Sequence, residues 1–228
     1  MGSKYIDIAV IVEPREHMYL KSVVENVLEK LVDVNVIIFH GNKNKDFIIN
    51  NLSNKLDKIE LINMGIDNLT VREYSDMLIT IDFWNKINGE RILLFQTDSI
   101  ICNYDEDILK ECQSYGFVGA PTKKIREIPW QNGGFSFRKK SKMIEAIKDI
   151  KNKTYYFPED RFFSVNKKDI VNPANWDLAN RFSVETYYNE KPFGIHKCWL
   201  YQDKKHMMKL IKNNPDLNIF NEIKQQKH

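Results

Sequence analysis

Two places in the chain hold carboxylates at positions suited to chemistry, and the first is Asp98. It follows the apolar run Leu93–Phe95 and two polar residues, Gln96 and Thr97. A carboxylate at the end of a buried strand can hold a hard cation such as Mg²⁺ or Mn²⁺ against a diphosphate, because these ions prefer oxygen ligands. The alternative is structural, since an aspartate after a strand often caps the turn that follows.

The second place is the pair Glu159 and Asp160, which follows Pro158 at a predicted helix start. Negative charges in a first helical turn complement the helix dipole, and this explains the pair without chemistry. The functional alternative is that one carboxylate lies beside an acceptor hydroxyl and takes its proton during a group transfer. We expect the helix N-terminus to lower the carboxylate pKa, which keeps the group ionised but weakens it as a base.

Asn132, Gly133 and Gly134 precede an alternating segment, 135–138, that predicts a strand. Paired glycines let backbone amides approach a sugar or a phosphate closely, and the asparagine side chain both donates to and accepts from hydroxyl groups. Asn-Gly is also common in tight turns, so a plain turn is the alternative. Trp130, just before, suits stacking on an apolar sugar or base face, or else packing in the core.

The segment 193–199 contains His196 and Lys197. A lone histidine is more often a hydrogen-bonded structural residue than a ligand. In a cation site, however, a neutral imidazole would favour Mn²⁺ over Mg²⁺, because nitrogen ligands suit softer ions. Lys197 would then offset charge on a departing diphosphate. The remaining histidines show no comparable neighbours in the sequence: His17, His40, His206 and His228.

The elements that must position these residues alternate between strands and helices. Near-continuous apolar runs, typical of a sheet covered on both faces, predict strands at 6–12, 34–39, 59–62 and 92–95. Apolar spacing predicts a helix over 20–31, and a capping box of Thr70 with Glu73 begins another that continues to Ile81. Later helices are predicted at 174–182 and 204–212.

This alternation predicts an α/β fold, with a mostly parallel central sheet flanked by helices, in one domain over residues 1–228. Ligands of such sheets bind beyond the carboxyl ends of the strands. Asp98 follows the fourth apolar run there, and Glu13 and Arg15 follow the first. The sequence lacks the Gly-rich motifs of dinucleotide-binding and P-loop proteins, which argues against both classes. It also lacks the Gly-x-Ser-x-Gly elbow, which argues against an α/β-hydrolase.

The composition of the 228 residues excludes several partners. The 34 basic and 31 acidic side chains leave a formal charge of +3, too balanced to predict a nucleic-acid partner. No apolar run reaches the roughly 18 residues of a membrane span. The three cysteines lack metal-binding spacing and suit reduced thiols, so we expect a cytoplasmic protein, of the host cell if the source is a virus.

Six segments occur together in an order that resembles a known family: 69–74, 95–99, 119–121, 132–138, 159–160 and 193–197. They are similar to an uncharacterised glycosyltransferase-like family found in bacteria, fungi and giant DNA viruses. The segment around Asp98 also resembles the acidic donor-binding motif of glycosyltransferases with the GT-A, or nucleotide-diphospho-sugar transferase, fold. In that pattern Gln96 occupies a position that is usually acidic.

The resemblance implies a metal-dependent glycosyltransferase that moves a sugar from a nucleotide-diphosphate donor, with a UDP-sugar favoured, to a glycan or other hydroxyl acceptor. Asp98 and His196 would hold Mn²⁺ or Mg²⁺. Asp160, with Glu159 as second choice, would be the catalytic base. The residues expected to contact the donor are Glu13, Arg15, Arg72, Tyr74, Gln96, Thr97, Asp98, Asn132, Gly133, Gly134 and Lys197, and Trp130 is expected to contact the acceptor.

The glutamine at position 96 keeps a second hypothesis open. A site with fewer carboxylates is expected to bind a metal ion less tightly. The alternative is therefore a catalytically degenerate module of the same fold that binds a glycan or a nucleotide without turnover.

Overall fold

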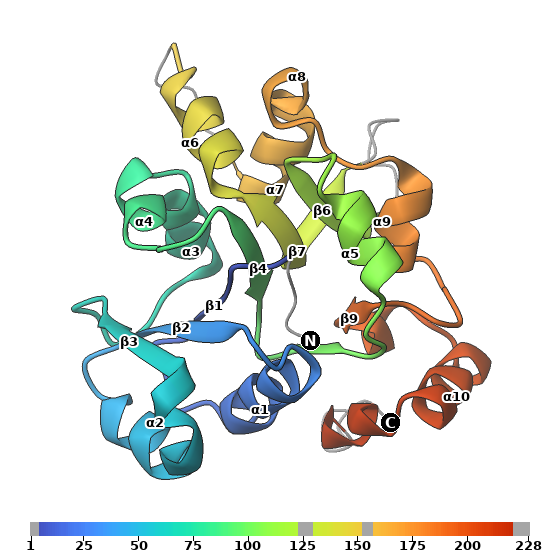
Figure 1. Cartoon of the computed structure of the whole chain (residues 1–228), viewed down its shortest axis with the longest axis horizontal. Coiled ribbons are helices and arrows are strands. Elements are labelled where there is room, and N and C mark those ends of the chain that lie inside the picture. Colours follow the sequence, from blue (N-terminus) through green and yellow to red (C-terminus); the bar gives the residue numbers. More distant parts are fainter. Residues whose placement is uncertain (1–4, 123–129, 152–156, 221–228) are drawn as a thin grey trace.

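A computed structural model describes residues 5–122, 130–151 and 157–220. Its main sheet has six strands in the order β3-β2-β1-β4-β7-β6 (Figure 1). The strands are β1 Ile8–Val12, β2 Asn35–His40, β3 Ile59–Asn63, β4 Arg91–Phe95, β6 Phe117–Pro121 and β7 Gln131–Lys139. The four strands predicted from apolar runs are confirmed, with ends that differ by a residue or two.

The first four strands pair in parallel, whereas β7 is antiparallel to both β4 and β6. Three of the five pairings are therefore parallel, and the prediction of a mixed α/β fold with a mostly parallel sheet is confirmed. The β6–β7 ladder is interrupted by a bulge, because Gly119 pairs with Ser136 while Ala120 pairs with Asn132. Residues 133–135 of β7 thus have no partner on β6.

Helices cover both faces of the main sheet (Figure 1), and two separate hydrophobic clusters hold the side chains between the sheet and these helices. Ala9 and Ile11 of β1 belong to one cluster, and Ile8 and Val10 to the other. The first cluster includes side chains of α1 Leu20–Lys30, α2 Lys45–Asn51, α5 Glu106–Cys112, α9 Trp176–Phe182 and α10 Lys204–Asn213. The second includes side chains of α3 Val71–Leu78, α4 Ile81–Asn85, α6 Lys140–Lys148 and α8 Lys168–Val171.

The capping box at the start of α3 is confirmed. The Thr70 hydroxyl accepts a hydrogen bond from the Glu73 amide, and the Glu73 carboxylate accepts one from the Thr70 amide. The helix ends at Leu78 and does not continue to Ile81 as predicted. Thr80 instead caps a new helix, α4, by accepting a hydrogen bond from the amide of Phe83.

A second, small sheet joins distant parts of the chain. It consists of β5 Ser99–Ile101, β9 Gly194–His196 and β8 Ser183–Val184, in that order. Strands β5 and β9 are antiparallel, with Ser99 opposite His196. These strands are only two or three residues long and were not predicted, yet their pairing brings His196 beside Asp98.

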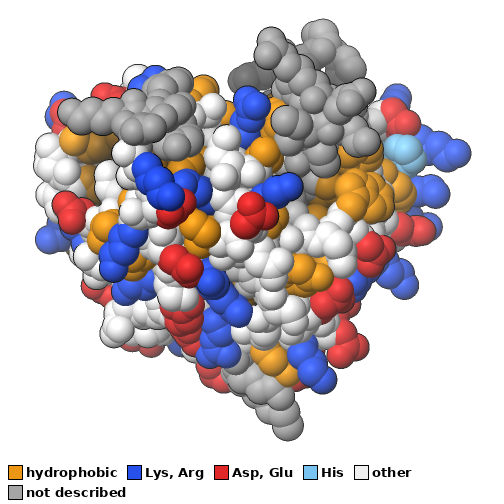
Figure 2. All heavy atoms as spheres, turned by 90° about the horizontal axis from the view of Figure 1, so that it is seen from above, with side chains coloured by type: hydrophobic (Ala, Val, Ile, Leu, Met, Phe, Trp, Pro, Cys, Tyr) orange, Lys and Arg blue, Asp and Glu red, His pale blue; other side chains and the backbone are white. Residues whose placement is uncertain are grey.

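The remaining helical segments are short: α7 Glu159–Arg161, the π-helical turn Phe162–Asn166, and 3-10 turns at Ser53–Lys58, Cys198–Leu200 and Pro215–Phe220. None of the helices in the described ranges has both the length and the apolar character needed to cross a bilayer. On the face shown in Figure 2, basic and acidic side chains are interspersed.

Candidate functional site

A cleft of about 660 Å³ lies beyond the carboxyl ends of β1 and β4, where ligands of parallel sheets are expected to bind. All but one of the residues predicted for the site line it. They are Glu13, Arg15, Tyr74, Gln96, Thr97, Asp98, Trp130, Asn132, Gly133, Gly134, Glu159, Asp160, His196 and Lys197. These predicted residues extend over 184 positions of the sequence, from Glu13 to Lys197, and the fold brings them together at one cleft.

Asp98 and His196 lie side by side in this cleft. The Oδ1 atom of Asp98 is 3.2 Å from Nε2 of His196, and the backbone amide of Lys197 donates to the Asp98 carbonyl. Ser99, and not Asp98, closes the turn after β4, because its hydroxyl donates to the Gln96 carbonyl and accepts from the Gln96 amide. The alternative in which Asp98 is only a turn cap is therefore wrong.

The buried carboxylate of Glu185 lies against the ring nitrogen of His196 that does not face Asp98. Oε1 of Glu185 lies 3.3 Å from Nδ1 of His196, and Oε1 of Gln96 lies 3.2 Å from Nε2. Histidines that bind metals commonly direct their second ring nitrogen at a carboxylate, which fixes the orientation of the ring. Glu185 comes directly after β8, so the small sheet positions Glu185, His196 and Asp98 together.

The charges of this group shift the pKa values of its members. Burial alone would lower the pKa of His196, but Asp98 and Glu185 raise it to about 9. Burial alone would raise the pKa of Asp98, but His196 and Lys197 hold it well below its ordinary value. In the protein without a bound cation, His196 is therefore a cation between two carboxylates at neutral pH.

Lys197 completes this side of the cleft. Its Nζ lies 3.2 Å from Oδ2 of Asp98, and its backbone adopts the left-handed conformation, with φ of 45°. Residues other than glycine adopt this conformation at some energetic cost, and such strain often occurs at functional sites. The strained backbone turns the chain directly after β9 and keeps the ammonium group at the cleft.

The donor atoms of this group suit a divalent cation. Within the described part of the chain, no three His, Cys, Asp or Glu side chains are grouped as a metal site. Asp98 and His196 supply two donors, the Gln96 amide oxygen supplies a third, and Oδ1 of Asp98 is buried without a hydrogen bond of regular geometry. This set fits an ion that takes its other ligands from water and phosphate oxygens, as Mg²⁺ commonly does.

Two glycines connect the cation side of the cleft to its other side. Gly133 and Gly134 lie inside β7, at the bulge, and the alternative of a tight turn is wrong. A methyl group on Gly134 would overlap the His196 ring, and one on Gly133 would overlap the Arg138 guanidinium. The close approach of these side chains therefore requires glycine at both positions.

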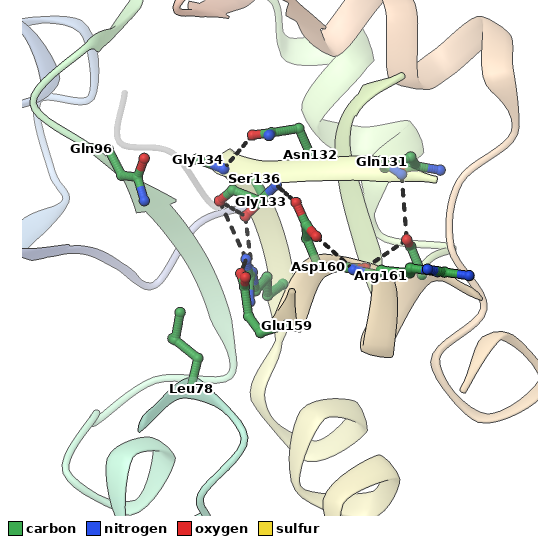
Figure 3. A network of polar contacts seen from close by, with 12 residues as sticks. Leu78, Gln96, Gln131, Asn132, Gly133, Gly134, Ser136, Glu159, Asp160 and Arg161 are labelled. Carbon is green, nitrogen blue, oxygen red and sulfur yellow. Dashed lines mark hydrogen bonds and ion pairs between the residues drawn. The ribbon is translucent and has the colours of Figure 1, made fainter. Parts of the chain in front are cut away.

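Asp160 lies on the far side of this glycine pair (Figure 3). Its Oδ2 accepts a hydrogen bond from the Gly133 amide at 3.2 Å, and its Oδ1 accepts one from the Arg161 amide at 2.6 Å. Burial, with a contribution from Glu159, raises the pKa of Asp160 to about 8. The expected lowering by a helix N-terminus is wrong, because α7 has only three residues and its carboxylates are buried.

Glu159 has a different environment from Asp160. Its Oε1 accepts a hydrogen bond at 2.8 Å from Nη2 of Arg138, which is completely buried. Of the two carboxylates, Glu159 is thus held in an ion pair, while Asp160 is held by backbone amides.

Near the end of β1, the side chains of Glu13 and Arg15 form a two-pronged ion pair. The Nε and Nη2 atoms of Arg15 lie 2.8 Å from the two carboxylate oxygens of Glu13. The Asn44 side chain donates to the carbonyls of both residues and so fixes this loop. The guanidinium, half exposed, is held at the cleft before any ligand arrives.

Arg72 is the predicted donor contact that does not line the cleft. Its Nε lies 2.7 Å from Asp76 on the exposed side of α3. Tyr74, two residues on, does line the cleft with a buried hydroxyl, and burial together with Glu159 raises its pKa. Arg72 and Tyr74 lie on the same helix but on different sides of it, so that only Tyr74 reaches the cleft.

Several residues of the cleft were not among the predicted site residues. Glu185, Phe157 and Tyr201 also line the cleft, and Arg138, which does not line it, pairs with Glu159, which does. Outside this lining, Nε2 of His17 lies 3.4 Å from the hydroxyl oxygen of Thr97. The sequence held one signal for the role of Arg138. It lies in the alternating segment 135–138, which predicts a strand, and an arginine in a buried strand needs a partner.

Comparisons with known proteins place the chain in a family. The model of a family described as protein of unknown function, DUF5672, matches residues 58–196, which is more than half of the chain. The chain belongs to this family. The match ends at His196 and includes Asp98, Gly133, Gly134 and Asp160. No curated protein matches the chain significantly.

Solved structures resemble the fold. The apo-form glycosyltransferase GlyE of Streptococcus pneumoniae TIGR4 has a TM-score of 0.55 at 10% identity, over 97% of this chain and 64% of GlyE. This chain thus spans less than two thirds of GlyE. The 4-diphosphocytidyl-2C-methyl-D-erythritolsynthase of Anaerococcus prevotii DSM 20548 has a TM-score of 0.49 at 10% identity, over 71% of this chain and 82% of its own. The likeness to GlyE confirms the prediction of a GT-A-like fold.

Proposed function

We propose that this protein is a metal-dependent glycosyltransferase that moves a sugar from a nucleotide-diphosphate donor to a hydroxyl acceptor. One observation carries the proposal. Consecutive glycines of β7 contact the two halves of the site, since Gly134 lies against His196 and Gly133 donates to Asp160. A donor with its diphosphate at Asp98 would thus place its sugar over the glycines and near a buried carboxylate.

Different residues of the cleft would bind different parts of the donor. Asp98, His196 and Gln96 would hold Mn²⁺ or Mg²⁺, and a bound cation would offset the charge of the diphosphate. Lys197 adds a positive charge to the same end of the cleft, where the leaving diphosphate gains negative charge. Arg15, oriented by Glu13, would contact the nucleotide.

At the other end, Asp160 would act as the base. The acceptor oxygen forms the new bond to the sugar carbon as the bond from that carbon to the diphosphate oxygen breaks, and Asp160 takes the acceptor proton. A base with a pKa of about 8 binds a proton far more strongly than an ordinary carboxylate, and a pKa near the working pH suits this role. The products are the glycosylated acceptor and a nucleoside diphosphate.

The proposal is tested with a panel of UDP- and GDP-sugars in the presence of Mn²⁺. We expect one donor to raise the melting temperature and to release its nucleoside diphosphate slowly by hydrolysis. Asp98→Asn, a change of similar shape, should abolish both effects, whereas Asp160→Asn should keep the thermal shift and lose turnover. A folded wild-type protein that responds to no donor would refute the proposal.

One observation favours a second candidate, a degenerate module of the same fold that binds a nucleotide or a glycan. With a pKa of about 9, His196 can itself supply the positive charge between Asp98 and Glu185. For such a module, EDTA would leave the donor-induced thermal shift unchanged and no hydrolysis would be detected. For the transferase, EDTA abolishes the shift and added Mn²⁺ restores it.

A further inference from the structure

Arg138 is a charged side chain in the interior of the protein, with no exposed surface. Its Nε donates to the Ser136 hydroxyl at 2.9 Å, and its Nη2 donates to Glu159 at 2.8 Å and to the Gly133 carbonyl at 3.3 Å. The guanidinium carbon lies 4.8 Å from the centre of the Phe117 ring. Buried charges of this kind are retained in proteins when they are paired, and here the partner belongs to the site.

Gly133 lies against the side chains of Arg138, Glu159 and Asp160, and Figure 3 shows Glu159 and Asp160 beside it. Its carbonyl accepts from Arg138, its amide donates to Asp160, and a methyl group on its Cα would overlap Arg138 and Glu159. The carbonyl and the amide flank the same Cα atom, so a shift of the Arg138–Glu159 pair would move Gly133 and with it the amide that holds Oδ2 of Asp160.

The charges that face Asp160 come from two elements. Glu159 precedes it on α7 and disfavours its ionised form, while Arg138 of β7 favours that form. Tyr74 of α3 is neutral at ordinary pH because its pKa is raised, and Ser164 of the following turn donates its hydroxyl to the Asp160 carbonyl. The balance between Glu159 and Arg138 is thus the main charge effect on Asp160, in addition to burial.

We propose that Glu159 is a positioning residue and not a second base. Paired with Arg138, it holds Gly133 in place, whose amide orients Asp160, and its charge sets the proton affinity of that carboxylate. The proposal rests on the proposed function for the role of Asp160 as a base. The effect of the pair on Asp160 is a property of the folded protein and needs no substrate.

The test is the titration of Asp160 followed by ¹³C NMR of its side-chain carboxyl carbon, assigned by its absence in Asp160→Asn. Glu159→Gln keeps the shape of the side chain but leaves the Arg138 charge unpaired. We expect the Asp160 midpoint to fall by about one pH unit or more, as for a carboxylate beside an unpaired cation. The matched control Arg138→Met/Glu159→Gln removes both charges and should return the midpoint toward the wild-type value.

A purely structural pair makes the opposite prediction, because the second substitution would add damage and restore nothing. An Asp160 midpoint that is unchanged in Glu159→Gln, or that moves further from wild type in the double variant, would overturn the proposal. Circular dichroism and the melting temperature verify that both variants are folded.

A second readout separates this proposal from the proposed function. If wild-type protein transfers sugar, the acid limb of its kcat/KM profile should move with the NMR midpoint in each variant. An NMR midpoint that shifts as expected in a protein without transferase activity would refute the proposed function and support the action of the pair on Asp160. Transfer with an acid limb that does not follow the NMR midpoint would refute the role of the pair in catalysis.

Discussion

Replacing Asp160 by asparagine should make the folded protein more stable, by an amount that grows with pH. Asparagine has nearly the same shape and its amide oxygen can still accept one of the two backbone hydrogen bonds, from Gly133 or Arg161. The substitution removes the ionisable group from a buried position. It therefore removes the free-energy cost of ionising a carboxylate inside the protein.

The sign and size follow from the two pKa values. The carboxyl group has a pKa of about 8 in the folded protein and of about 3.9 in an unfolded chain. Between these values the folded state retains a proton that the unfolded state has released, so this group makes the protein less stable as pH rises. The limiting slope is about 1.4 kcal/mol per pH unit, or about 2.7 kcal/mol from pH 5 to pH 7.

The assay is urea unfolding of both proteins at pH 5, 6, 7 and 8, followed by tryptophan fluorescence. The difference in free energy of unfolding, variant minus wild type, should rise across this range and level off above pH 8. Asp177→Asn is a suitable control because that carboxylate is exposed in a surface ion pair with Arg181, so its effect on the free energy of unfolding should be small. A flat or falling difference for Asp160→Asn would refute the assignment of a raised pKa.

Three further outcomes are expected. Gly134→Ala should weaken Mn²⁺-dependent donor binding, measured by calorimetry, because the new methyl group displaces the His196 ring; binding equal to wild type would contradict the packing. Glu185→Gln should lower Mn²⁺ affinity about tenfold by loosening the same ring, and unchanged affinity would show that this contact does not matter. Arg72→Ala should leave donor affinity within about twofold of wild type, because its guanidinium pairs with Asp76; a large loss would show that Arg72 reaches the donor.

The central strands were predictable because their sequences are locally consistent. Residues 8–12 and 92–95 are buried on both faces of the sheet, so their apolar character is continuous and independent of what surrounds them. The start of α3 was predictable for a similar reason, since both halves of its capping box lie within four residues. Local signals of this kind survive in any fold that contains the element.

Most residues of the candidate site could be named from the sequence, but the contacts that join them could not. The neighbours Asp98 and His196 meet through β5 and β9, strands of three residues that carry no periodic signal. Glu185 has no sequence feature that links it to His196, because the link depends on the parallel pairing of β8 with β9. The predicted lowering of the Asp160 pKa was wrong. The prediction considered only the neighbouring helix N-terminus, whereas the burial that raises the pKa depends on the whole fold.

The bulge in β7 has a consequence for the evolution and engineering of this chain. Between Asn132 and Ser136 the ladder with β6 is interrupted, so the amide and carbonyl of Gly133 bond to side chains in place of a neighbouring strand. A deletion that made this edge of the sheet regular would improve its pairing and dismantle the ligand cleft at once. A regular sheet and an intact cleft thus exclude each other at residues 133–135. Insertions or deletions at these residues should be the rarest among functional relatives.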